Sequence, residues 1–321
     1  PAPEMERMEL DEVLLRAAAV GLIGEAFRNA AFPGAPKEFA YERAMERLLG
    51  IGLVNQQGAL TELGRAISKL PVSIDSARIL VDAPPKIQGT LCDLVALMER
   101  GERLVLPTHG IRNEKRLEAI VDDRKEFLAG CRHEVDTLLR FLHDGKADHH
   151  ALNRTVLKDT RKLSQLLRRL FEFPKNMAGK TSTEDLATIS RHLIKRVPEW
   201  VFVLRERAEG KSASRKPSRN TGEPWGNGEE ELLVDPFTPA FLTEPARNTK
   251  AGIILSHTWL GAKRGTKVSG VGRLLLPCSL KMLVEEDFGE LVVKEPKTPK
   301  GGRGQDISKE GYLAELEAWP K

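Results

Sequence analysis

Two groups of cationic side chains are the residues of this sequence that most clearly predict a binding function. The first group follows one predicted helix whose other side carries leucines, and it consists of Lys158, Arg161, Lys162, Arg168 and Arg169. Because the leucines mark the buried side, we expect these cations on the exposed side, where they would contact the phosphates of a nucleic acid. An ordinary solvated helix surface has the same pattern, so the spacing leaves that alternative open.

The second group lies in the last third of the chain and combines an aromatic ring with cations: Trp259, Lys263, Arg264, Lys267 and Arg273. Proteins that bind single strands pair a cationic groove with aromatic side chains on which the bases stack. The alternative for Trp259 is a place in the hydrophobic core. We predict that both groups contribute to binding a nucleic acid strand.

The sequence lacks the residues that hydrolyse a nucleoside triphosphate. Such a site needs a glycine-rich loop ending in Lys-Ser/Thr and an acidic pair that holds magnesium. Neither Gly-x-x-x-x-Gly-Lys-Ser/Thr nor Asp-Glu-x-His occurs, and Gly301-Gly302-Arg303-Gly304 has no lysine. We therefore expect no cofactor in this chain and no ATP hydrolysis by this chain alone.

Other pairs of reactive side chains do not predict a catalytic or metal site. His149 and His150 are adjacent, so on a helix they point in different directions, and no Glu or Cys lies at ligand spacing. Asp122-Asp123 is expected on a solvated helix face. Ser256-His257 lacks a third partner for nucleophilic catalysis. We assign no catalytic residue and no metal ligand.

Composition is compatible with a polyanionic partner without requiring one. The chain has 321 residues, 40% hydrophobic and 30% charged, a formal net charge of +4 and a sequence pI near 8.9. Its three cysteines, Cys92, Cys131 and Cys278, have no metal-binding spacing, so we expect reduced thiols. With no run of about 18 apolar residues and no signal pattern, we expect a cytoplasmic protein that does not enter the membrane.

The segment Leu60–Pro71 predicts a short helix. Thr61 is a suitable N-cap, Leu63, Ile67 and Leu70 share one face, and Pro71 cannot continue the helix. Just upstream, residues 53–60 read as two short strands around a turn. Together with amphipathic helices near 6–24 and 37–49, these elements predict a winged-helix module over residues 1–72.

Three motifs in this module carry a family resemblance. Leu48-Leu49-Gly50-Ile51-Gly52-Leu53-Val54, then Leu60-Thr61-Glu62-Leu63-Gly64-Arg65, then Leu70-Pro71 resemble the segment that follows the motor domains of DEAH-box RNA helicases of the bacterial HrpA/HrpB type. The resemblance implies a winged helix, a ratchet-like helical bundle and an OB-type barrel that line an RNA channel. It also implies RecA-like motor domains ahead of Pro1, which would bind the ATP and magnesium.

The remaining sequence divides into a helical part and a β-rich part. Apolar stripes of helical period run through residues 73–208 and predict a helical bundle. From residue 209 a polar, basic linker leads into about five β-like runs, which predict a small OB-like barrel within 209–321. The expected runs are Glu231–Val234, Ala251–Ser256, Gly272–Leu276, Lys281–Val284 and Glu290–Lys294. The predicted fold class is thus α+β with several domains.

Functions of different classes remain open. The first is the accessory C-terminal portion of a DEAH-type RNA helicase, which would hold single-stranded RNA, or DNA, by its backbone while the motor steps. The second is a stand-alone winged-helix and barrel module that binds a protein partner or a duplex without a motor. A third, a DNA-specific regulator reading bases with the helix over residues 63–70, has only Arg65 and Lys69 as candidates and ranks last.

Overall fold

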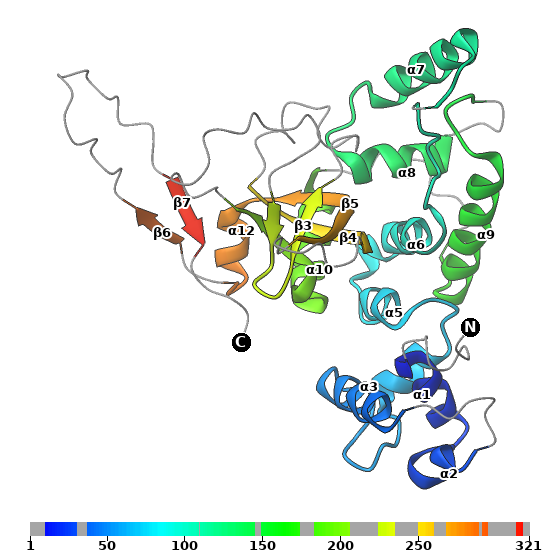
Figure 1. The fold of residues 1–321 in the computed structure, drawn as a ribbon, viewed down its shortest axis with the longest axis vertical. Helices are drawn as coiled ribbons and strands as arrows, with labels where there is room; N and C mark the ends of the chain where they lie inside the picture. Colours follow the sequence, from blue (N-terminus) through cyan, green and yellow to red (C-terminus); the bar gives the residue numbers. More distant parts are fainter. Residues whose placement is uncertain are drawn as a thin grey trace.

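The computed structural model describes residues 10–30, 37–108, 110–144, 149–173, 183–205, 224–234, 250–259, 268–288, 291–294 and 313–316. The fold is α+β, as predicted, with helices in the first two thirds and a closed, mixed β-barrel after them (Figure 1). Among the described residues no helix combines the length and apolar character needed to cross a membrane.

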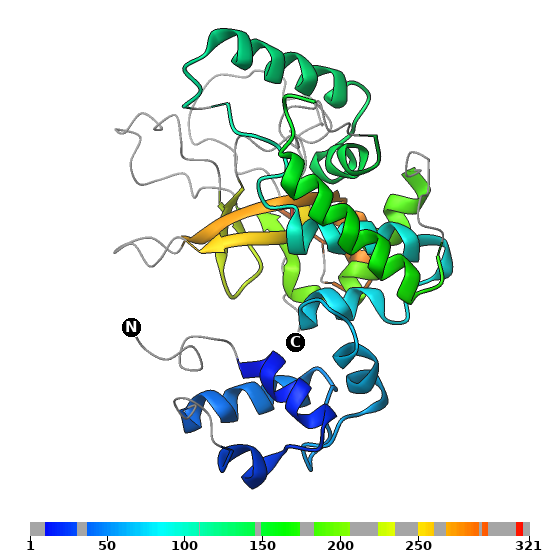
Figure 2. The ribbon, with the colours of Figure 1, turned by 90° about the vertical axis from the view of Figure 1, so that its right-hand side faces the viewer.

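The first helices form a group at one end of the molecule, drawn in blue in Figures 1 and 2. They are α1 (Leu10–Ala19), α2 (Gly24–Arg28), α3 (Glu38–Gly50) and α4 (Glu62–Ser68). The two short strands expected between α3 and α4 are reduced to one antiparallel bridge between Val54 and Leu60. The predicted cap is confirmed, because the Thr61 hydroxyl accepts a hydrogen bond from the Gly64 backbone N–H at 3.0 Å.

The middle of the chain is helical, as its apolar stripes predicted. Its helices are α5 (Ile74–Leu80), α6 (Pro85–Arg100), α7 (Glu114–Leu128), α8 (Glu134–Asp144), α9 (Arg154–Leu170) and α10 (Thr183–Arg196). Helix α6 is central: every residue from Leu91 to Leu97 is buried, which requires neighbours on all sides of the helix. Those neighbours are α5, α8, α9 and α10.

A 3-10 turn, Pro198–Trp200, leads from α10 into the barrel. The barrel strands are β1 (Val201–Leu204), β2 (Pro224–Gly226), β3 (Glu231–Val234), β4 (Ala251–Trp259) and β5 (Val268–Cys278). They close in the order β1-β2-β3-β5-β4, with β4 paired to β1 and with β3 and β5 parallel. The barrel interior is filled by Phe202, Trp225, Leu232, Val234, Ile254 and Leu275.

The strand predictions were right in part. The runs at 231–234, 251–256 and 272–276 all lie within barrel strands, but β1 falls in the range that we expected to be helical bundle. The run Lys281–Val284 is instead part of helix α12 (Leu280–Glu285), because Ser279 caps that helix by accepting from the Met282 N–H. The last expected run forms β6 (Leu291–Lys294), which pairs with β7 (Leu313–Leu316) outside the barrel.

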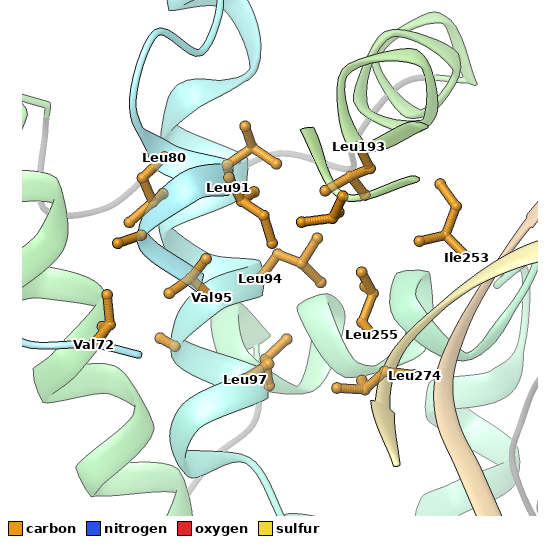
Figure 3. Close-up of a cluster of buried hydrophobic side chains, with 14 of the residues drawn as sticks. Val72, Leu80, Leu91, Leu94, Val95, Leu97, Leu193, Ile253, Leu255 and Leu274 are labelled. Atoms are coloured by element: carbon orange, nitrogen blue, oxygen red, sulfur yellow. The ribbon is translucent and has the colours of Figure 1, made fainter. Parts of the chain in front are cut away.

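The barrel packs on the helices through an apolar interface. Figure 3 shows Leu91, Leu94 and Leu97 of α6 close to Leu193 of α10 and to strand residues Ile253, Leu255 and Leu274. The barrel also needs a small residue inside β4, since a Cβ added to Gly252 would lie 2.5 Å from Cδ1 of Leu275. The barrel strands pack against α8 and α10, and share a buried apolar cluster with α6.

Candidate nucleic-acid interface

Helix α9 presents an exposed cationic stripe on the surface of the helical part. Lys158, Lys162 and Arg169 are exposed, as predicted, and Arg154 extends the line by one turn. We call these four residues the α9 stripe. Positions 154, 158, 162 and 169 share one side of a helix, and the stripe is about 22 Å long at 1.5 Å per residue. The Lys162 ammonium pairs with Asp159 at 3.3 Å; no partner is recorded for the other three within the described part of the chain.

The sequence analysis missed Arg154, although the signal was present. It lies four residues before Lys158, which is the same interval as from Lys158 to Lys162. It also follows Asn153, the residue whose side chain caps α9 by accepting from the Val156 N–H. A cation in the first turn of a helix is unfavourable for the helix dipole, so Arg154 does not serve helix stability.

Arg161 has a structural role at the end of α8. Its Nε donates to the Leu142 carbonyl oxygen at 2.7 Å, and a terminal nitrogen donates to the His143 carbonyl at 3.4 Å. These carbonyls belong to the last turn of α8, where backbone acceptors lack partners within the helix. Burial lowers the pKa of Arg161 from its ordinary value, with Asp144 opposing that effect. The Arg161 guanidinium therefore caps the C-terminal end of α8.

The expectation that Arg168 lies on the exposed side of α9 is wrong, because its side chain is only 1% exposed. Its Nε donates to Oδ1 of Asp93 in α6 at 2.9 Å, and a terminal nitrogen bonds the other carboxylate oxygen. Ser164 also donates to Asp93, and His143 Nε2 lies 3.0 Å from it. Burial favours a raised pKa for Asp93, but His143, Arg168 and Ser164 together lower it. Arg168 thus joins α9 to α6.

The second predicted group is described only in part. Arg273 lies in β5, partly exposed, and its NH1 is 3.8 Å from a Glu102 oxygen in the segment after α6. Trp259 is the last residue of β4 and pairs with Gly270 of β5, but its side chain lies outside the described atoms. Lys263, Arg264 and Lys267 lie outside the described residues.

Helix α9 and strand β5, which carries Arg273, lie on different sides of α6. Helix α9 packs on α6 and α8, whereas the barrel contacts α8 and α10. In Figure 1 α9 lies on the far side of α6 from β4 and β5, and in Figure 2 α9 lies in front of α6. A strand that touched both the α9 stripe and Arg273 would have to pass around α6 or over the segments at its end.

Among the other reactive side chains, Asp123 has a structural role. The Asp123 carboxylate accepts from the backbone N–H groups of His150 and Ala151, so it ties α7 to the segment before α9. The described residues contain no group of three or more His, Cys, Asp or Glu able to hold a metal ion. The three cysteines form no disulfide, and burial raises the pKa of the Cys92 and Cys278 thiols to about 12.

Comparison of the sequence with models of protein families gives no match, and comparison with curated proteins gives none.

Proposed function

We propose that this chain holds single-stranded RNA by its phosphate backbone, as the accessory C-terminal portion of a DEAH-type RNA helicase. The observation that carries the proposal is the α9 stripe, a row of exposed cations on a helix whose other side is buried. Phosphate contacts of this kind give affinity without base specificity, which suits a protein that must hold any sequence.

The barrel supports the same proposal. A closed five-stranded barrel in the order β1-β2-β3-β5-β4, with β3 and β5 parallel, has the strand arrangement that we expect of an OB-type barrel. OB-type barrels are common binders of single strands. The N-terminal group of α1, α3, the Val54–Leu60 bridge and α4 has the element order of a winged helix. Both assignments belong to the proposal.

The motor belongs to the proposal as well. RecA-like domains in another segment would bind ATP and magnesium and move the strand. The α9 stripe would keep the strand from dissociating, together with a group in the barrel part: Trp259, Lys263, Arg264, Lys267 and Arg273. Arg161 and Arg168 are left out, since their guanidinium groups bond backbone carbonyls and Asp93.

The test is binding of a fluorescein-labelled oligouridylate, followed by anisotropy in a salt series. We expect the logarithm of affinity to fall linearly with the logarithm of salt concentration. The triple variant Lys158→Ala, Lys162→Ala, Arg169→Ala should lower the slope by about 2 and the affinity at about 0.1 M salt by on the order of 10- to 100-fold.

The matched control removes three exposed cations elsewhere, with Arg16→Ala, Arg43→Ala and Lys281→Ala on α1, α3 and α12. This control changes net charge equally, so a purely global charge effect would weaken both variants alike. Equal binding by the triple variant and the unmodified chain would overturn the proposal. It would favour a module that binds a protein partner or a duplex.

A further inference from the structure

The segment between α6 and α7 pairs with the segment that leads into α9. Val105 and Leu152 form an antiparallel bridge, with Leu106 N–H donating to the Ala151 carbonyl and Asn153 N–H donating to the Leu104 carbonyl, both at 2.9 Å. Arg103 precedes Leu104 and Arg154 follows Asn153, so the two arginines flank this hydrogen bond on the two paired segments. The bridge therefore brings Arg103 to the N-terminal end of the α9 stripe.

Arg103 is an exposed cation that the fold does not use. Within the described residues its side chain makes no recorded hydrogen bond or ion pair, unlike Arg161 and Arg168. Its backbone has φ of 61°, a left-handed conformation that an asparagine or glycine would adopt with less strain. An arginine at this position therefore lowers stability, and no hydrogen bond or ion pair of its side chain with a described residue offsets this loss.

The residue before Arg103 connects the same segment to the barrel. Glu102 lies 3.8 Å from Arg273 of β5, measured from carboxylate oxygen to NH1. The segment after α6 thus touches the barrel through Glu102 and the residue before α9 through Leu104, the neighbour of Arg103. It offers a route from the α9 stripe to Arg273 on the barrel over the end of α6.

We propose that Arg103 is a further RNA-binding residue, which carries a single strand from the α9 stripe across the segment after α6 to Arg273 on the barrel. This inference rests on the proposed function. The strand would follow Arg169, Lys162, Lys158, Arg154, Arg103 and then Arg273. Glu102 is a carboxylate in the middle of this path, so it repels a polyanion and makes the middle of the path bind the strand more weakly than the α9 stripe or Arg273.

The test uses Arg103→Asn, which removes the charge and suits the left-handed backbone. With an oligouridylate of roughly 20 nucleotides, long enough for α9 and the barrel together, we expect about fivefold weaker binding and a salt slope lower by about 0.7. With one of roughly 6 nucleotides, which can lie on the α9 stripe alone, we expect a smaller loss. Arg103→Lys should retain affinity. Arg43→Asn on α3 is the charge-matched control, and binding should not change.

Glu102→Gln tests the same path in the opposite direction. Removing the carboxylate should tighten binding of the longer oligonucleotide by about two- to fivefold. If Arg103→Asn and Glu102→Gln both bind the longer strand like the unmodified chain, while the α9 triple variant weakens binding, the path is overturned and the proposed function stands. If the α9 triple variant also has no effect, the proposed function fails with it.

Discussion

The Glu134 carboxylate at the start of α8 accepts a hydrogen bond from the backbone N–H of Leu275 in β5, with the oxygen 3.0 Å from the nitrogen. Both residues are buried, and they are 141 positions apart in the chain. The preceding residue, Leu274, has a left-handed backbone with φ of 56°, which is rare for a bulky side chain. The β4–β5 register has pairs on both sides of Leu274 but none at it. This bond joins the helical part to the barrel where the ladder is interrupted.

Removing the Glu134 acceptor should loosen the barrel from the helices. Glu134→Ala leaves the Leu275 N–H buried without this acceptor, and we expect the free energy of unfolding to fall by about 1–3 kcal/mol. Glu134→Gln keeps a side-chain oxygen and should lose less. Urea unfolding followed by circular dichroism measures both. An alanine variant as stable as the glutamine variant would show that the bond contributes nothing.

Gly64, in the Leu60–Arg65 motif, should tolerate no side chain. A Cβ added there would lie 2.0 Å from the Leu53 carbonyl oxygen, so Gly64→Ala forces α4 away from the segment before it. We expect the free energy of unfolding to fall by about 3 kcal/mol or more. Removal of the α4 cap by Thr61→Ala should lower it by about 1 kcal/mol.

Limited proteolysis and urea unfolding should show this loss in the N-terminal helices. Glu62→Ala, an exposed position on the same helix, is the control and should stay within about 0.5 kcal/mol. If Gly64→Ala unfolds at the same urea concentration as this control, the close approach of Gly64 to Leu53 is not a constraint on the fold.

Replacing either of two adjacent arginines on α9 should affect a different property of the protein. Arg168→Ala leaves the buried Asp93 without its main cation, and we expect the free energy of unfolding to fall by about 3–5 kcal/mol. Arg169→Ala removes an exposed charge, so stability should change by less than about 0.5 kcal/mol while affinity for a single strand falls about fivefold. Thermal unfolding and anisotropy together separate the two roles. Comparable stability losses in both variants would contradict the assignment.

His133 should make the protein less stable in mild acid. Burial, with a smaller contribution from Arg132 and against the effect of Asp136, lowers the pKa of His133 to about 4. An unfolded histidine has a pKa near 6.5, so between about pH 6.5 and about pH 4 the unfolded chain binds a proton that the folded chain does not. Stability from this group is complete above about pH 6.5 and declines as the pH falls, by up to about 3 kcal/mol.

The variant His133→Asn tests this pH dependence. The Asn side chain retains an oxygen that can accept from the Asp136 N–H, which now lies 3.3 Å from Nδ1 of His133. The slope of melting temperature against pH should flatten between about pH 6.5 and about pH 4. A residual slope is expected because burial also lowers the pKa of His192. An unchanged slope in the variant would exclude His133 as the source.

Local sequence patterns predicted the helices of the first two thirds and the start of α4, whereas Lys281–Val284, predicted as a strand, forms part of helix α12. The apolar stripes required one buried side on each helix, and the Thr61 cap is formed by residues three positions apart. The strands at 231–234, 251–256 and 272–276 were visible for the same reason, since alternation and turn residues act over short distances. These features need no partner from elsewhere in the chain.

The tertiary structure decided which cations are available to a ligand. Arg168 and Arg169 are equivalent by type, but only Arg168 faces Asp93, which lies 75 positions away on α6. Arg161 likewise meets the end of α8, and the Val105–Leu152 bridge brings the backbone of the segment that contains Arg103 to the start of α9. Partners this distant follow from how the helices pack, and a helical period alone cannot identify them.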